Sequence, residues 1–460
     1  MEKILVKDIL KITKGKLIIG NLETKCVNFS KDTRKIKKDD VYIAIRGEKF
    51  DGNKFWNKAL DNGANVVIVE KIECSDSDLK KYIKQNKTII LVENTLEALY
   101  KIAAFKRKMS KIKVIAITGS VGKTSTKDII ANVISKKYKT LKTIGNNNNN
   151  IGMPFTILRL KDEEVAVLEM GMNHLGEIEL LSKIAKPDIC VITNVGTSHI
   201  GNLGSRENIL KAKLEILDGS ENPKVVINND NDMLYEWYKL NKQNKNIYTY
   251  SINKESDLKA ESIKLNLESS NFRVLGKNIK VPIAGEHFIL NALSAITVGK
   301  LLGIEENKII DGIESFELTK KRMEIANTKS GIKIINDAYN ASYDSMIASI
   351  KILEGYKENR KIAVLGDMKE LGDFSEEIHR RVGEYLNNSN IDILICGGKN
   401  SKYIYNEVKG NAKMKSYFYT ENKQIVEITN KIAQKNDVIL IKASNGMKFY
   451  KIASELIEII

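Results

Sequence analysis

Short aliphatic runs that end in small or polar residues recur along this chain, and helical segments separate them. Such runs include KVIAI at 113–117, VAVLE at 165–169 and DICVIT at 188–193. The rhythm restarts near residue 316 with KIIND, KIAVLGD, DILICGG and DVILIKAS. Buried strands that alternate with helices predict parallel β-sheets covered by helices, an α/β fold that binds ligands at the carboxyl ends of its strands.

The chain is long enough for several hydrophobic cores. Its 460 residues correspond to about three domains at roughly 150 residues each. Residues 1–108 mix strand-like runs (VYIAI, NVVIVE and TIILVE) with helical stretches, and the pattern changes at Lys113. We therefore predict domains at 1–108, 109–315 and 316–460.

Composition excludes several classes of protein. The net charge is +16, but lysines are spread along the whole chain and no arginine-rich or aromatic-basic stretch occurs, so we expect no nucleic-acid partner. No apolar run approaches the ~18 residues that span a bilayer, and the N-terminus lacks the features of a signal peptide. We expect a cytoplasmic protein without membrane insertion. The four cysteines are far apart, which argues against a disulfide framework or a zinc cluster.

A glycine-rich loop follows the strand at 113–117 and precedes a helical stretch from about Lys123 to Lys137. Such a loop wraps phosphates with backbone N–H groups at a helix N-terminus. It departs from GxxxxGK[ST] because Ile117 occupies the first glycine position, and a glycine turn in an unrelated α/β protein is the alternative. Lys123 would reach the terminal phosphates of ATP and the Thr124 hydroxyl would bind Mg²⁺. The predicted nucleotide-binding residues are Gly119, Ser120, Val121, Gly122, Lys123, Thr124 and Ser125.

Two further polar residues follow apolar strands. Glu169 ends VAVLE, and His199 lies just beyond DICVIT. In a doubly wound sheet both side chains would converge on the phosphate loop, where a carboxylate and a threonine hydroxyl suit Mg²⁺. Taken alone, each has an ordinary interpretation as a strand-end carboxylate or a loop histidine.

A series of motifs, in one order, resembles the Mur ligases over nearly the whole chain. The central motifs are TGSVGKTST, NNNNNIGMPFTILRL, LEMGMNHLGEI, TNVGTSHIGNLGS and KAKLEI. The flanking motifs are Asp32-Thr33-Arg34, Arg46-Gly47-Glu48, Asp51-Gly52, Gly285-Glu286-His287, Asn291-Ala292, Arg322-Met323-Glu324 and NDAYNA at 336–341. The resemblance implies three domains: a UDP-sugar-peptide-binding domain, a central P-loop ATPase-type domain with a mostly parallel sheet, and a C-terminal Rossmann-like domain.

The resemblance also implies an activity. IGMPFTILRL, EMGMNHLGEI, DAYNAS, LGDMKELG and KASNGMK are most similar to the members that use ATP to add D-alanyl-D-alanine to UDP-N-acetylmuramoyl-tripeptide, through an acyl phosphate. Lysine and diaminopimelate both stay open as the third residue of that peptide, and we expect a monomer. The alternatives are the member that adds the third residue, whose DNPR-like motif is missing here, a folylpolyglutamate-type ligase, and a P-loop NTPase switch.

The same resemblance assigns site residues. It implies that Lys123, Glu169, His199 and Lys213 are catalytic, and that Thr124, Glu169, His199 and a carbamylated Lys213 bind Mg²⁺. His287, Asn291, Arg322 and Asp337 join the nucleotide-binding residues. The substrate-binding residues are Asp32, Thr33, Arg34, Arg46, Gly47, Asp51, Asn149, Asn340 and Ser345. This chain departs from the family pattern at Phe288, Lys321, Tyr343, Ala443 and Asn445.

Overall fold

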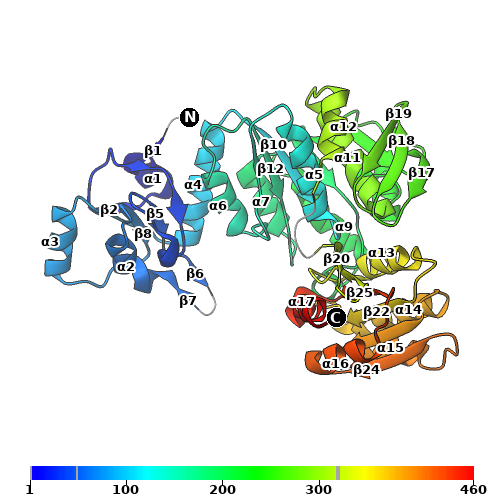
Figure 1. Cartoon of the computed structure of the whole chain (residues 1–460). Helices are drawn as coiled ribbons and strands as arrows, with labels where there is room; N and C mark the ends of the chain where they lie inside the picture. The colour runs from blue at the N-terminus through cyan, green and yellow to red at the C-terminus, as the bar shows by residue number, and fades with distance from the viewer. Residues whose placement is uncertain (1–2, 48–49, 318–321) are drawn as a thin grey trace.

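Three larger β-sheets succeed one another along the chain in the computed structural model, which describes residues 3–47, 50–317 and 322–460 (Figure 1). Glu48 and Lys321 lie outside these ranges. The first sheet lies at one end of the molecule, and the long helix α4 (Thr95–Met109) connects it to the central sheet. The C-terminal sheet lies next to the central sheet, away from the first sheet.

The first sheet has five strands in the order β2-β9-β8-β5-β4. Only the β2–β9 pair is antiparallel. All four residues of β8 are buried, as expected for a parallel strand covered on both faces. The elements of this part are β1 (Ile4–Leu5), α1 (Val6–Thr13), β2 (Lys16–Ile19), β3 (Lys25–Cys26), β4 (Phe29–Ser30), β5 (Val41–Ile43), β6 (Arg46–Gly47), β7 (Phe50–Asp51), α2 (Trp56–Asp61), β8 (Val66–Val69), α3 (Asp76–Lys84) and β9 (Thr88–Leu91).

The central sheet has seven strands, all parallel, in the order β11-β12-β10-β13-β14-β15-β16. Ile117 pairs with Glu169 and Thr118 with Ile192, so the phosphate loop, Glu169 and the segment after Ile192 leave the sheet at one edge. The strands are β10 (Lys113–Thr118), β11 (Thr140–Lys142), β12 (Val165–Glu169), β13 (Ile189–Ile192), β14 (Lys224–Asn228), β15 (Ile247–Ser251) and β16 (Leu258–Lys259). The helices are α5 (Lys123–Ser135), α6 (Gly152–Leu158), α7 (Glu177–Ala185), α8 (Ile200–Leu203), α9 (Arg206–Leu214) and α10 (Asp232–Leu240).

A small antiparallel sheet and two helices follow the central sheet. The sheet contains β17 (Glu261–Leu265), β18 (Ser270–Val274) and β19 (Lys277–Val281). Helices α11 (Glu286–Leu301) and α12 (Glu306–Glu314) pack against α5, so they cover the helix that begins at the phosphate loop.

The C-terminal sheet has six strands in the order β20-β21-β25-β22-β23-β24, and only β20 is antiparallel to its neighbour. Its core strands, such as β22 and β25, are fully buried aliphatic runs. The elements are β20 (Glu324–Asn327), β21 (Lys333–Asn336), α13 (Tyr343–Glu354), β22 (Lys361–Gly366), the short helix η4 (Gly372–Phe374), α14 (Ser375–Asn387), β23 (Ile393–Gly397), α15 (Lys402–Val408), β24 (Lys415–Tyr419), α16 (Asn422–Ile432), β25 (Val438–Lys442) and α17 (Phe449–Ile459).

This architecture confirms the predicted α/β class, with a parallel central sheet and a second, mostly parallel C-terminal sheet. The antiparallel β17–β19 sheet was not predicted, because its strands are largely polar and exposed. Within the described ranges, every helix is too short or too polar to cross a bilayer.

Candidate active site

The phosphate loop is held against the next strand of the central sheet. Val121 N donates to Asn194 Oδ1 (2.9 Å), and Thr193 Oγ1 donates to the Val121 carbonyl (2.8 Å). A Cβ on Gly119 would lie 1.9 Å from Thr193 Oγ1, so only glycine permits this close approach. The Lys123 ammonium folds back onto the loop and donates to the Gly119 carbonyl (2.7 Å). Burial lowers the pKa of Lys123, and the Glu169 carboxylate partly offsets this effect.

A cavity of about 590 Å³ opens in front of this loop, between the central and C-terminal sheets. Most of the predicted central and C-terminal site residues line it: Ser120, Val121, Gly122, Lys123, Thr124, Ser125, Asn149, Glu169, His199, His287, Asn291, Arg322, Asp337, Asn340 and Ser345. Gly119 and Lys213 are not among the residues that line it. This cavity is thus lined by residues that are more than 200 positions apart in the sequence.

Glu169 presents one carboxylate oxygen that has no hydrogen-bond partner among the described residues. Its Oε1 accepts from Asn148 Nδ2 (2.8 Å), whereas its buried Oε2 is unpaired. A buried, unpaired carboxylate oxygen, in the cavity that Thr124 also lines, is a ligand that suits a hard cation. In the described part of the chain no three His, Cys, Asp or Glu side chains form a metal cluster, so a metal here would need ligands of other types, such as the Thr124 hydroxyl.

His199 faces the C-terminal sheet. It has a left-handed backbone (φ 66°) at the start of α8, and its Nδ1 lies 2.9 Å from Glu370 Oε2. That distance suits an ion pair, although the ring N–H is not aligned for a hydrogen bond. The contact with His199 lowers the pKa of Glu370.

Lys213 is buried on α9, with 1% of its surface exposed. Within the described residues its ammonium has no hydrogen bond or ion pair. Burial, with a smaller contribution from the Lys123 charge, lowers the pKa of Lys213 well below its usual value. Burial thus shifts this side chain towards the neutral amine.

Helix α11 forms another part of the cavity wall. Asn291 Oδ1 accepts from Thr126 Oγ1 (2.9 Å) on α5, while its buried Nδ2 is unpaired among the described residues. Phe288, where the family pattern has asparagine, is 2% exposed, and its ring lies 4.4 Å from that of His287. Tyr250, which was not predicted from the sequence, lines the same cavity. Aromatic side chains beside one unpaired amide group suit a planar ligand such as a nucleobase.

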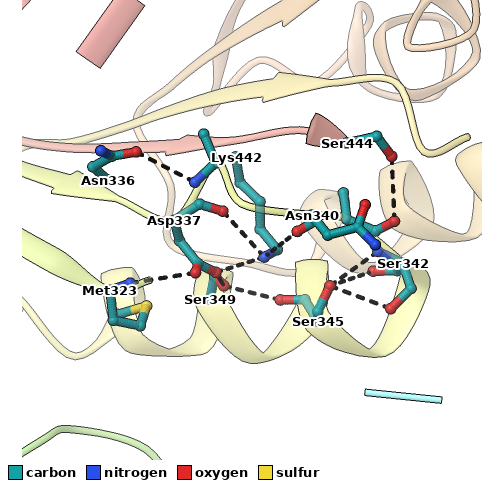
Figure 2. A network of polar contacts seen from close by, with 11 residues as sticks. Met323, Asn336, Asp337, Asn340, Ser342, Ser345, Ser349, Lys442 and Ser444 are labelled. Atoms are coloured by element: carbon teal, nitrogen blue, oxygen red, sulfur yellow. Dashed lines mark hydrogen bonds and ion pairs between the residues drawn. The ribbon is translucent and has the colours of Figure 1, made fainter. Parts of the chain in front are cut away.

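The C-terminal side of the cavity is a polar network (Figure 2). The Asp337 carboxylate binds the buried Lys442 ammonium at 2.5 Å and accepts from Ser349 Oγ at 2.7 Å. Lys442 also donates to the Asn340 carbonyl (3.1 Å), and Ser345 Oγ accepts from the Ser342 backbone N–H (2.9 Å). Lys442 was not predicted from the sequence, although its position at the end of an apolar strand was a usable signal.

The predicted substrate residues of the first sheet lie apart from this cavity. Asp32 binds the exposed Arg34 guanidinium through two bonds of 2.9 Å, which lowers the pKa of Asp32 to about 2. In the β6–β7 hairpin, Arg46 lies opposite Asp51 in the strand register. Together with Thr33 and Gly47 they are absent from the cavity lining, so the structure does not bring them to the phosphate loop.

Comparison with known proteins matches three regions to Mur ligase families. Residues 28–107 match the Mur ligase family catalytic domain, residues 117–299 the Mur ligase middle domain, and residues 321–445 the Mur ligase glutamate ligase domain. UDP-N-acetylmuramoyl-tripeptide–D-alanyl-D-alanine ligase of Bacillus subtilis (strain 168) is 38% identical over 467 residues, which cover 100% of this chain and 99% of that protein.

Solved structures show the same similarity. A crystal structure of MurF from Acinetobacter baumannii superposes with a TM-score of 0.89 at 28% identity and covers 100% of this chain and 99% of that one. MurF ligase from Thermotoga maritima in complex with ADP gives a TM-score of 0.82 at 29% identity, over 94% of this chain and 97% of that one.

Proposed function

This chain belongs to the Mur ligase family, and we propose that it is an ATP-dependent ligase that adds D-alanyl-D-alanine to UDP-N-acetylmuramoyl-tripeptide in peptidoglycan precursor synthesis. Relatives with this name match it over 92–99% of their length. The observation that carries the proposal is the single cavity lined by both the phosphate loop and the C-terminal sheet. A ligase needs that arrangement, because phosphoryl donor, carboxylate and amine must meet at one point.

In the proposed reaction, ATP phosphorylates the terminal carboxylate of the tripeptide. The resulting acyl phosphate has a better leaving group than a free carboxylate, and the amine of D-alanyl-D-alanine displaces phosphate to form the amide. Lys123 would neutralise charge on the transferring phosphoryl group. Its ammonium, which among the described residues is bound by loop carbonyls alone, is free to exchange those contacts for phosphate oxygens.

Mg²⁺, where bound, would neutralise phosphate charge. Thr124 and the unpaired Glu169 oxygen would hold one ion, and His199 with carbamylated Lys213 a second. Carbamylation requires a neutral amine to attack CO₂ with loss of a proton. The burial of Lys213 without a carboxylate partner among the described residues favours that form.

The remaining assignments follow the family. Asp32, Thr33, Arg34, Arg46, Gly47 and Asp51 would bind the UDP-sugar portion, and Asn149, Asn340 and Ser345 the peptide. His287, Asn291, Arg322 and Asp337 would bind nucleotide. We also propose domain boundaries near residues 108 and 315, a monomer, and a cytoplasmic location, where the UDP-linked substrate would be available.

A coupled assay for ADP release tests the proposed function. We expect release only when UDP-N-acetylmuramoyl-tripeptide and D-alanyl-D-alanine are both present, with Lys123→Ala as the inactive control. A panel of acceptors with lysine or diaminopimelate as third residue identifies the natural peptide. Activity on a UDP-dipeptide plus a free amino acid would instead indicate the ligase that adds the third residue, and hydrolysis without either substrate would indicate an NTPase switch.

A further inference from the structure

Two consecutive residues of opposite charge, Lys369 and Glu370, project into the cavity from the loop after β22. Glu370 has φ +67°, in the left-handed region that is uncommon for a residue with a side chain. Its Oε2 lies 2.9 Å from His199 Nδ1. Lys369 Nζ instead lies 3.0 Å from the position that a Cβ on Gly446 would occupy. The backbone conformation therefore directs the two charges to different parts of the cavity.

The loop that carries them is fixed on both sides. Lys369 N donates to Ser444 Oγ (2.9 Å), the serine at the edge of the network in Figure 2. The Glu370 carbonyl accepts from Gly201 N (3.3 Å), on α8 of the central sheet. A left-handed residue anchored in this way indicates that the direction of the side chains matters for function.

The cations that line the cavity differ in their partners. Lys123 belongs to the phosphate loop, and Arg322 donates to that loop. The Lys442 ammonium is paired with Asp337. Of these four cations, Lys369 is the one whose ammonium contacts neither a carboxylate nor the phosphate loop within the described residues.

The carboxylates that line the cavity also differ in their partners. Glu169 belongs to the predicted metal site, and Asp337 is paired. Glu177 accepts a backbone hydrogen bond (2.7 Å), and Asp344 packs against the backbone of the segment at residue 196 beside two arginines. Among the described lining residues Glu370 is the remaining carboxylate: it is about half exposed, its one close partner is the His199 ring, and it lies near the Lys123 charge.

We propose that Lys369 and Glu370 bind the two charged ends of the amine substrate, with Lys369 on its terminal carboxylate and Glu370 on its ammonium. The inference rests on the proposed function. A dipeptide is a zwitterion, and opposite charges on adjacent residues complement it. Because Glu370 faces His199 and Lys123, this orientation places the reacting nitrogen at the phosphate end of the cavity. Lys369 and Glu370 are thus specificity-determining residues for the dipeptide substrate.

Substrate analogues that lack one charge test each contact. For Lys369 the measurement is the KM of D-alanyl-D-alanine carboxamide divided by that of D-alanyl-D-alanine. Because a hydrogen bond to a charged group is involved, we expect the wild-type ratio to be roughly tenfold or more, and to approach one in Lys369→Gln. For Glu370 the measurement is the inhibition constant of D-lactoyl-D-alanine, in which a hydroxyl replaces the ammonium, divided by the KM of D-alanyl-D-alanine. This ratio should approach one in Glu370→Gln.

Exposed residues near the loop supply matched controls. Lys399→Gln and Glu377→Gln remove the same charges outside the cavity lining and should leave both ratios at wild-type values. If a variant is inactive, calorimetric titration of the same compounds into enzyme with ATP analogue and UDP-tripeptide gives the ratios. Wild-type ratios in Lys369→Gln and Glu370→Gln would overturn the inference, whereas a wild-type enzyme without ligation would overturn the proposed function instead.

Discussion

Arg322 donates a hydrogen bond from Nη2 to Thr124 Oγ1 at 3.0 Å, which joins the start of the C-terminal sheet to the phosphate loop. The guanidinium also lies over the Tyr339 ring, 4.1 Å from its centroid. A planar cation is suited to both contacts at once, because it stacks on the ring while its edge donates. The position of the C-terminal sheet is therefore coupled to the hydroxyl that is predicted to bind metal.

Replacing Arg322 by lysine tests this coupling. Lysine keeps the charge but loses the planar fork, so we expect kcat/KM for ATP to fall by roughly tenfold or more. Steady-state kinetics at saturating acceptor and dipeptide measure the change. Arg159→Lys, at an exposed arginine outside the cavity, is the control and should behave like the wild type. An unchanged kcat/KM in Arg322→Lys would remove this contact from the reaction.

Substrate binding should bring the first sheet closer to the other two. Its predicted UDP-binding residues do not line the cavity, yet the acceptor must reach from them to Lys123. Separate folding units commonly close around substrates in this way. We expect the radius of gyration in solution scattering to decrease when ATP analogue and UDP-tripeptide are added together. An unchanged radius, with binding confirmed by calorimetry, would contradict the prediction.

His379 should make the protein less stable in acid. It is fully buried, its Nε2 accepts from Met368 N (3.0 Å), and its Nδ1 contacts the Ser375 carbonyl, so the folded state requires a neutral ring. Burial lowers the pKa of His379 below its usual value of 6.5. Below that pH His379 is protonated in the unfolded chain and stays neutral in the folded chain, so the free energy of unfolding decreases as pH falls.

Urea unfolding at neutral pH and at mildly acidic pH measures the effect. His379→Gln should lower stability at neutral pH by about 1–3 kcal/mol, because the amide cannot replace both contacts of the ring and one backbone group loses its partner. It should also weaken the dependence on pH. His174→Gln, at an exposed histidine, is the control. An unaltered pH dependence in His379→Gln would show that another group causes the acid sensitivity.

The sequence predicted those features that depend on local pattern. The strand expected at 165–169 is observed with the same bounds, and the helix predicted from Lys123 begins there. Since parallel strands share a carboxyl edge, the approach of Glu169 and His199 to the phosphate loop followed from topology. The contact between His199 and Glu370 did not, because it depends on how two sheets are placed, and no spacing in the sequence encodes that placement.

Lys213 illustrates the same limit at one residue. By pattern alone it is a solvated lysine on a charged helix, and its neighbour Lys211 is indeed exposed. Two residues correspond to about 200° around a helix, so the pair points to opposite faces. Lys211 therefore faces solvent while Lys213 is 1% exposed. Only the packing of α9 against α7, α8 and α10 distinguishes them, and the resemblance to the Mur ligases supplied that assignment.

The function of Lys213 can be tested by chemical rescue. If it is carbamylated, the site needs anionic oxygens where the sequence encodes a cation, so Lys213→Ala should lose ligation by roughly a hundredfold or more. Acetate should partly restore activity by occupying the space left by the side chain. Lys213→Arg should resist rescue, because a guanidinium stays charged and fills that space.

Bicarbonate and a neighbouring lysine provide the controls. Wild-type enzyme depleted of CO₂ should lose activity and regain it when bicarbonate is added, while Lys211→Ala should keep wild-type activity with or without acetate. Mass spectrometry of the intact wild-type protein under bicarbonate, compared with Lys213→Ala, gives a readout that does not depend on turnover. Wild-type rates in Lys213→Ala would show that this buried amine has a structural role and does not take part in the reaction.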